Sequence, residues 1–183
     1  MVVKQPVNAS AEDHDCRKTS KKIRATFEHP YRFVQSGLSN VFLVGIDYYV
    51  CEECGKQSAD IPALNDLMMK IARVVVSQEA RLDGNEIRFL RKRLRKKAID
   101  FGKIIGVTAE QISRWENDGN PPSESADKLI RVFFCLLSGD AYLSEKVNSQ
   151  IDAWLETLPG VERSMKFNAE LRDHQWDAEA VPA

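Results

Sequence analysis

Glycines and capping residues divide the second half of the chain into short helices, and this feature most constrains the fold. Apolar residues recur at spacings of three and four from Asn85 onward, which is typical of one face of an α-helix. Gly106 ends a predicted helix over 98–105, and Thr108 begins the next, since Ser and Thr are favoured caps. This region is therefore predicted to hold several short helices joined by tight corners.

The same signals predict three further helices. The first further helix is a basic segment over 86–97 that carries one apolar stripe. The helix after Thr108, already described, is expected to end at about Asn117, before a Gly and two Pro residues. The remaining two helices are expected over 124–137 and 143–158. The expected apolar face of the 124–137 helix consists of Leu129, Val132, Phe133 and Leu136.

Two short helices joined by a glycine corner fit a helix-turn-helix motif. Gly102 supplies the small residue that a closely packed corner needs, Gly106 supplies the turn, and Val107 is an apolar plug. On the helix that follows, Ile112 and Trp115 are three positions apart and are expected to face the core. Its other side chains are short or hydrogen-bonding, which suits base edges and phosphates in a major groove. These predicted DNA-contacting residues are Ala109, Glu110, Gln111, Ser113, Arg114 and Asn117.

Charge is unevenly distributed along the chain. The 26 basic and 27 acidic residues nearly cancel, so net charge alone does not indicate a polyanionic partner. Residues 86–104, however, contain eight basic and two acidic residues, whereas 140–183 contain four basic and nine acidic ones. A basic block beside an acidic one suggests nucleic-acid contact in one part of a protein. The alternative is that the basic helix is an ordinary solvated face.

The helical region strongly resembles the Xre/Cro-like helix-turn-helix over about residues 86–137. The resemblance rests on four short runs: Leu90-Arg91-Lys92, Gly106-Val107-Thr108, Ile112-Ser113-Arg114-Trp115-Glu116 and Gly119. It implies that 108–114 form the recognition helix, with Thr108 among the DNA contacts, and that Trp115 and Glu116 hold this helix against its neighbours.

The chain departs from that family at the start of the second helix. Family members often carry a Gln there that touches the DNA backbone, where this chain has Ala98. We expect Lys96 and Lys97 to replace that contact by charge, although a lysine binds phosphate as a point charge and orients it less well.

The first third of the chain is predicted to be a small β-rich module. Residues 1–22 are polar and are expected to form a flexible arm. Branched and aromatic residues over 23–34 and 41–50 flank a Gly/Ser/Asn turn, which is a hairpin signal. A linking helix is expected to begin near Pro62. The predicted fold class is therefore mainly α, with a zinc-ribbon-like β-hairpin followed by the helical domain.

A Cys-x-x-Cys pair, Cys51 and Cys54, follows the second predicted strand, and Gly55 comes directly after it. Two thiolates at this spacing can bind one tetrahedral Zn²⁺, and the glycine permits a tight turn. The candidates for the missing ligands are Cys16 and His14, with His29 and Asp13 also within the same part of the chain. The alternatives are a ribbon that has lost its metal and a redox pair, although the βαβ surroundings of a thioredoxin-like site are missing.

This N-terminal region resembles the zinc-binding module of MqsA/YgiT-type antitoxins and their regulator relatives. The resemblance rests on Tyr31, Ser36-Gly37-Leu38, Asn40-Val41, Cys51-Glu52-Glu53-Cys54-Gly55 and Ile61-Pro62. That family joins a small zinc-binding module to an Xre-like domain and uses two Cys-x-x-Cys pairs. The first pair is absent here, so the resemblance supports only Cys51 and Cys54 as zinc ligands.

The sequence thus predicts four parts: an arm over 1–22, a zinc-ribbon-like module with its linking helix over 23–80, a helix-turn-helix domain over 81–138, and a helix with an acidic tail over 139–183, which is a candidate dimerisation element. The dimer surface is expected on the last two helices, where apolar residues exceed what one small core needs: Phe133, Phe134, Leu136, Leu137, Val147, Ile151, Trp154 and Leu155. The expected function is a cytoplasmic homodimeric regulator, most simply a repressor, that binds operator DNA. The alternative is an antitoxin whose N-terminal module also binds a toxin. Neither a membrane partner nor an enzymatic activity is expected, since no catalytic constellation, phosphate loop or apolar span stands out.

Overall fold

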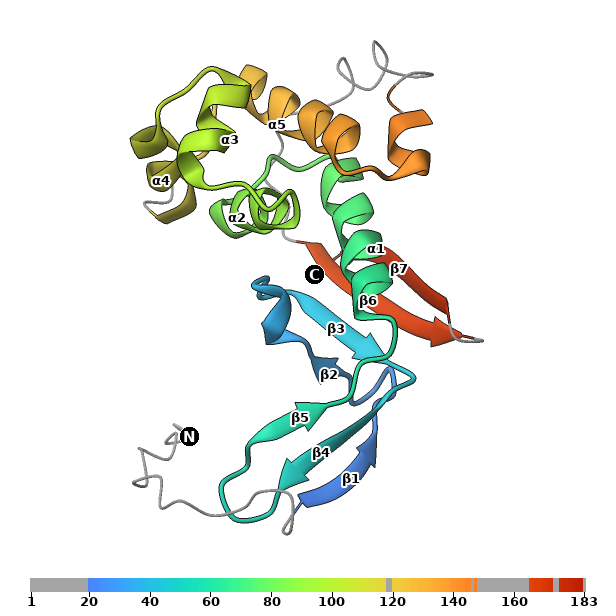
Figure 1. The fold of residues 1–183 in the computed structure, drawn as a ribbon. Helices are drawn as coiled ribbons and strands as arrows, with labels where there is room; N and C mark the ends of the chain where they lie inside the picture. Colours follow the sequence, from blue (N-terminus) through green and yellow to red (C-terminus); the bar gives the residue numbers. More distant parts are fainter. Residues whose placement is uncertain (1–19, 118–119, 146, 148–164, 173–174, 183) are drawn as a thin grey trace.

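The computed structural model describes residues 20–117, 120–145, 147, 165–172 and 175–182. Figure 1 shows two small sheets at one end and a group of helices at the other, with helix α1 (Leu64–Ser77) running between them. Within these described residues, no helix is long and apolar enough to cross a membrane.

The first sheet has three antiparallel strands in the order β1-β4-β5: Ser20–Arg24, Asp47–Cys51 and Gln57–Ala59. Its register places Ser20 opposite Cys51 and Arg24 opposite Asp47. Residues 20–22, predicted as the end of the flexible arm, therefore belong to a strand.

The second sheet has four strands in the order β2-β3-β6-β7: Tyr31–Arg32, Val41–Val44, Met165–Arg172 and Gln175–Pro182. Strands β2 and β3 pair antiparallel across the predicted turn, which includes a short 3₁₀ helix and Gly37 with φ of 82°. Strand β3 then pairs in parallel with β6, which comes from the far end of the chain.

The predicted hairpin over 23–34 and 41–50 is confirmed at its turn, where β2 and β3 pair, but the two segments do not form one hairpin. Gly45 has φ of 73°, a left-handed conformation that divides the second segment into β3 and β4. The Gly45 N–H donates to the carbonyl of Ala25, and the Ala25 N–H donates to the carbonyl of Ile46. The chain therefore changes direction at this glycine, and β3 and β4 enter different sheets.

The C-terminal segment contains a β-hairpin that sequence periodicity did not indicate. Strands β6 and β7 pair antiparallel, and β7 packs on α1. Trp176 on β7 is fully buried, and its indole N–H donates to the carbonyl of Pro62 over 2.8 Å. The predicted helix over 143–158 lies largely outside the described residues; of its neighbourhood, 141–145 and 147 are helical.

Four helices follow the linking segment: α2 (Gly84–Arg93), α3 (Ala98–Ile105), α4 (Ala109–Asn117) and α5 (Glu124–Leu137). The limits predicted for the last three are confirmed. Helix α2 differs from its predicted range of 86–97, because Asp83 and Glu86 form a capping box at its start and Arg95 takes a positive φ of 54° beyond its end.

The predicted apolar face of α5 is only partly right: Val132 and Phe133 are half-buried, and Phe133 packs against the core. Leu129 and Leu136 are 41% and 47% exposed, whereas Ile130, Phe134 and Cys135 are buried. The buried face also contains two charged residues, Asp127 and Arg131, which a search for apolar periodicity does not count as core.

Arg131 is completely buried and joins α5 to the end of α1. Its guanidinium donates to the Asp127 carboxylate over 2.8 Å and to several main-chain carbonyls, and Asp127 accepts the Leu82 N–H over 2.7 Å. The carbonyl acceptors belong to Val75, Val76, Gln78 and Ala80. A buried charge needs this degree of pairing, so the segment between α1 and α2 is held in one conformation.

Candidate nucleic-acid interface

The corner between α3 and α4 has the close packing that the sequence predicts. Gly106 takes a positive φ of 76°, and the Val107 N–H donates to the Gly102 carbonyl over 2.9 Å. A Cβ atom at Gly102 would lie 2.6 Å from the Val107 carbonyl oxygen, which is closer than real contacts allow. Glycine is therefore required at Gly102 for space and favoured at Gly106 for its backbone conformation.

A second close approach, at Gly84, was missed by sequence reasoning. A Cβ atom at Gly84 would collide with the carbonyl oxygen of Trp115, so the first turn of α2 rests directly on the last turn of α4. The feature of the sequence that could have indicated this contact is a glycine directly after the capping residue Asp83.

Helix α4 is oriented by its buried side. Ile112 is fully buried and Trp115 nearly so, as predicted from their spacing. At its start, the Thr108 hydroxyl accepts the Gln111 N–H over 3.2 Å, which is the expected capping contact. The opposite side of the helix is left facing solvent.

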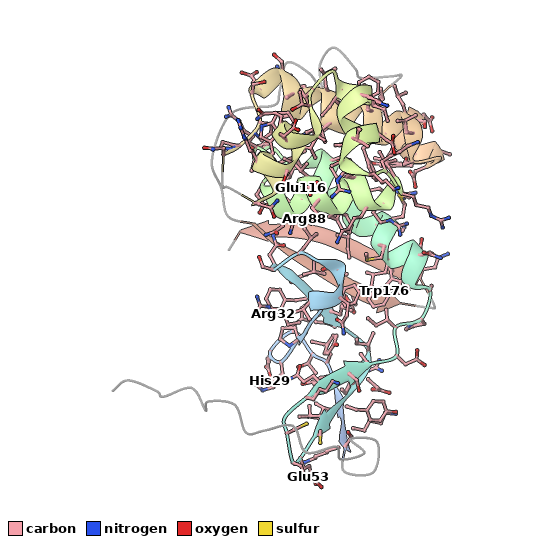
Figure 2. The ribbon with its side chains drawn as sticks, turned by 60° about the vertical axis from the view of Figure 1, so that its left-hand side comes forward. His29, Arg32, Glu53, Arg88, Glu116 and Trp176 are labelled. Carbon is pink, nitrogen blue, oxygen red and sulfur yellow. The ribbon has the colours of Figure 1, made fainter. Side chains whose placement is uncertain are left out.

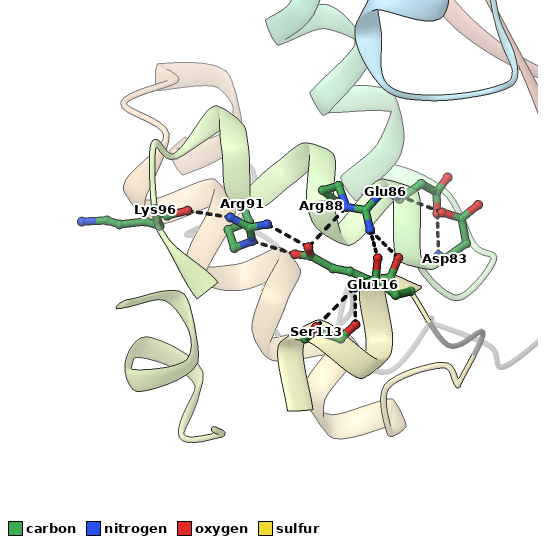
Figure 3. Close-up of polar contacts among 8 residues, drawn as sticks. Asp83, Glu86, Arg88, Arg91, Lys96, Ser113 and Glu116 are labelled. Carbon is green, nitrogen blue, oxygen red and sulfur yellow. Dashed lines mark hydrogen bonds and ion pairs between the residues drawn. The ribbon is translucent and has the colours of Figure 1, made fainter. Parts of the chain in front are cut away.

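Glu116, near the end of α4, is held by two arginines of α2 (Figure 3). Arg91 donates to both carboxylate oxygens over 2.6 and 2.8 Å, and Arg88 donates to the carboxylate and to the Glu116 carbonyl. The buried carboxylate raises the pKa of Arg91. Glu116 therefore has the holding role that the resemblance implies, and two residues of the basic block take part in it.

Most of the remaining cations of the basic block lie around the turn between α2 and α3, and Lys103 lies in the last turn of α3. Arg91 also donates to the carbonyl of Lys96 over 2.9 Å, which orders this turn. Arg93 is half-buried, and within the described part of the chain its Nε has no hydrogen-bond acceptor. The exposed cations are Lys92, Arg95, Lys96, Lys97 and Lys103.

The predicted DNA-contacting residues differ in how exposed they are and in whether they are already hydrogen-bonded within the protein. Asn117 donates to the carbonyl and hydroxyl oxygens of Ser113 and accepts from Arg88, so its orientation is set by α2. Ala109 and Gln111 are half-buried. The exposed members of the predicted set are Lys96, Lys97, Thr108, Glu110, Ser113, Arg114 and Asn117.

Glu110 and Arg114 lie one turn apart on the exposed side of α4. The backbone N–H of Glu110 and the Thr108 hydroxyl hold the pKa of the Glu110 carboxyl below its usual range, and Arg114 adds to this. Helix α4 therefore presents a carboxylate and a guanidinium one turn apart.

A buried acid, Glu86, lies behind this surface and was also missed. The side-chain amide of Gln78 and the backbone N–H of Asp83 both donate to its Oε2 atom, over 2.8 and 2.9 Å. Burial raises the pKa of Glu86 to about 7. The Asp83-x-x-Glu86 spacing was a readable capping-box signal, but it did not indicate burial.

The cysteine pair lies at the opposite end of the molecule. Cys51 is buried at the end of β4, Cys54 is exposed, and the Gly55 N–H donates to the Cys51 carbonyl over 2.9 Å in a tight turn. Glu53 and His29 also lie at this strand-rich end, far from Arg88 and Glu116 (Figure 2). Among the residues that the structure describes, no group of three or more potential metal ligands comes together. The candidate ligands Cys16 and His14 lie outside those residues.

Comparison with known proteins supports the interpretation of the helical end. Residues 87–138, which cover most of α2 and all of α3 to α5, match the family model described as helix-turn-helix. No curated protein and no solved structure matches the chain. The match supports DNA binding of the kind found in transcriptional regulators, and it does not extend to the strand-rich end.

Proposed function

We propose that this protein is a sequence-specific DNA-binding transcriptional regulator, acting as a repressor through α3 and α4. The observation that carries the proposal is the polar outer side of α4, held rigidly by the Glu116 contacts and flanked by the exposed lysines before α3. Lysines position a protein on phosphates, and a polar helix in the major groove reads base edges.

Homodimerisation is part of the same proposal. One helix-turn-helix offers too small an interface to select one site in a genome, whereas a two-fold dimer reads two half-sites about one helical turn apart. Leu129, Leu136 and Leu137 on α5 are 41% to 49% exposed, which supports a dimer surface on this helix. Of the residues that the sequence placed on a dimer surface, Phe134 and Val147 are buried, and Ile151, Trp154 and Leu155 lie outside the described residues.

A footprint on the DNA upstream of the protein's own gene tests the proposal. We expect two protected half-sites related by two-fold symmetry, and an affinity that falls steeply with salt as phosphate contacts release counterions. Selection from a random duplex library at low salt extends the test to other operators. Failure to protect or enrich any duplex would contradict DNA-binding regulation.

Zinc binding by Cys51 and Cys54 is proposed on separate grounds. The turn brings both cysteines to one end of β4, and β1 begins there, since Ser20 lies opposite Cys51. Cys16 is four residues before Ser20 in the sequence, which makes it the candidate for a third ligand. Zinc would tie this end of the sheet together and has no role in DNA contact.

The zinc proposal predicts one metal ion per chain in the native protein. Cys51→Ser should release it, because a site that loses one thiolate binds zinc far more weakly, while Cys135→Ser on α5 should retain it. Metal content by mass spectrometry measures both. A native protein purified without chelator that contains no zinc would contradict the proposal.

The antitoxin alternative concerns the strand-rich end. Phe27 and Val34 are among the most exposed large apolar side chains there, at 65% and 58%, which favours a protein partner. Co-expression with the product of the adjacent gene tests it: a stable complex that inhibits a toxic ribonuclease would favour the antitoxin role over plain regulation.

A further inference from the structure

The polar side chains of α4 are not equally able to distinguish one base from another. Asn117 and Ser113 are hydrogen-bonded to each other, and Asn117 is also bound by Arg88. Arg114 is exposed and makes no hydrogen bond or ion pair with the described residues. Glu110 lies one turn before it; its carboxylate is contacted by Thr108 and its own backbone N–H, and with about four lone-pair sites it can still accept from a base. These two opposite charges are thus the long, outward side chains at the centre of the reading surface.

A carboxylate at this position restricts what DNA the helix can accept. It cannot donate a hydrogen bond when ionised, and it is repelled by phosphates and by the acceptor atoms of guanine and thymine. Its favourable partner in a major groove is an amino group that donates a hydrogen bond. Acidic side chains typically accept this bond from the N4 amino group of cytosine. Arginine has the complementary preference, because its guanidinium binds guanine O6 and N7.

We infer that Glu110 is a specificity-determining residue that requires a cytosine in the operator half-site, next to the guanine that Arg114 binds. This rests on the proposed function. The Thr108 hydroxyl and the backbone N–H of Glu110 hold the carboxylate in its ionised form at the start of the helix, where it meets the groove. The attraction to phosphate comes instead from Lys96, Lys97 and Lys103, which lie off the reading surface.

Parallel selection of binding sites from random duplex DNA tests this inference. The wild type, Glu110→Gln and Glu124→Gln are compared; Glu124 is an exposed glutamate in the first turn of α5 and serves as the matched control. Wild type and Glu124→Gln should select the same half-site containing cytosine. Glu110→Gln should replace that cytosine by adenine, since a glutamine side chain pairs with adenine N6 and N7.

Affinity measurements on the selected site give the magnitude. Changing the cytosine should weaken wild-type binding by roughly five- to hundredfold and leave Glu110→Gln unaffected or strengthened. If Glu110→Gln selects the same bases as the wild type, or if the wild type selects no cytosine that depends on this residue, the inference is overturned while DNA binding stands. If the wild type selects no sequence at all, the proposed function itself fails.

Discussion

At the scale of single residues, the charges of this protein divide into internal and external groups. Arg88 and Arg91 belong to the basic block, yet both bind Glu116 inside the molecule. Arg114 and Lys97, by contrast, face solvent and keep their hydrogen-bonding capacity for a partner. Sequence spacing placed all of these residues on helices, but only the packed structure separates those that hold the fold from those available to DNA.

Replacing both Gln111 and Arg114 by alanine should abolish specific operator binding. The proposed function assigns these side chains hydrogen bonds to base edges, and a good bidentate pair is worth about 1–3 kcal/mol of discrimination. Fluorescence anisotropy with operator DNA measures the loss, and circular dichroism with thermal unfolding shows that the fold is kept. A double variant with native affinity would contradict the assignment of α4 as the recognition helix.

Glu86→Gln should reduce the dependence of stability on pH. The pKa of Glu86 rises to about 7 in the folded state, from 4.5, so between these values the folded protein holds a proton that the unfolded chain has released. The contribution of Glu86 to the free energy of unfolding is therefore full below pH 4.5. It falls as the pH rises from there through 7, by up to about 3 kcal/mol in all.

Urea unfolding at pH 5, 6, 7 and 8 measures this effect as the difference between variant and wild type. Glu124→Gln is the control, because the pKa of that exposed carboxyl is lowered by Lys128 and its proton is already lost in this range. Equal pH slopes for the wild type and Glu86→Gln would contradict the burial of an acid that titrates near neutrality.

At the scale of elements, the α2, α3 and α4 helices meet through main-chain contacts at two glycines. Gly102 lies against Val107, and Gly84 lies against Trp115. Both contacts bring backbone to backbone, where a side chain cannot move aside. The position of the recognition helix is thus set by small residues as well as by the Glu116 ion pairs.

Gly102→Ala should destabilise the protein by about 1–3 kcal/mol, which is the usual cost of forcing an extra methyl group into a packed site. Ser125→Ala, on the exposed side of α5, should change stability by less than about 0.5 kcal/mol. Chemical unfolding measures both. A Gly102→Ala protein as stable as the wild type would show that the corner is not tightly packed.

At the scale of the whole molecule, α1 connects the strand-rich end to the helical end. Its start lies under the C-terminal hairpin, where Trp176 binds the Pro62 carbonyl, and its end is bound by Arg131 of α5. Arg73 on the same helix also pairs with Asp140 over 2.8 Å and lies against Tyr142. The strand-rich end and the DNA-binding helices therefore share one rigid support.

The proposed dimer predicts that Leu129→Ser together with Leu136→Ser will shift the protein toward monomer. Burying one leucine at an interface is worth about 1.5–3 kcal/mol, so the dissociation constant should rise at least tenfold. Sedimentation equilibrium measures it, with Leu64→Ser as control, since Leu64 is equally exposed but lies on α1. A wild type that is monomeric at all concentrations would contradict the dimer.

The sequence by itself determined the limits of three helices at the helical end, because helix limits depend on local chemistry. Gly106, Thr108 and Ser123 act on their nearest neighbours, and the predicted limits of α3, α4 and α5 are those observed. The outward side of α4 followed from the same local period, since Ile112 and Trp115 are buried as expected.

Only the tertiary structure decided which distant segments meet. Strand β6 pairs with β3 across more than a hundred residues, and neither strand carries a local signal for the other. The same holds for Arg131. From the sequence an arginine is expected at the surface, but in the structure it is buried and donates to carbonyls at and beyond the end of α1. Pairing of this kind depends on partners brought together by folding, which a single local pattern does not contain.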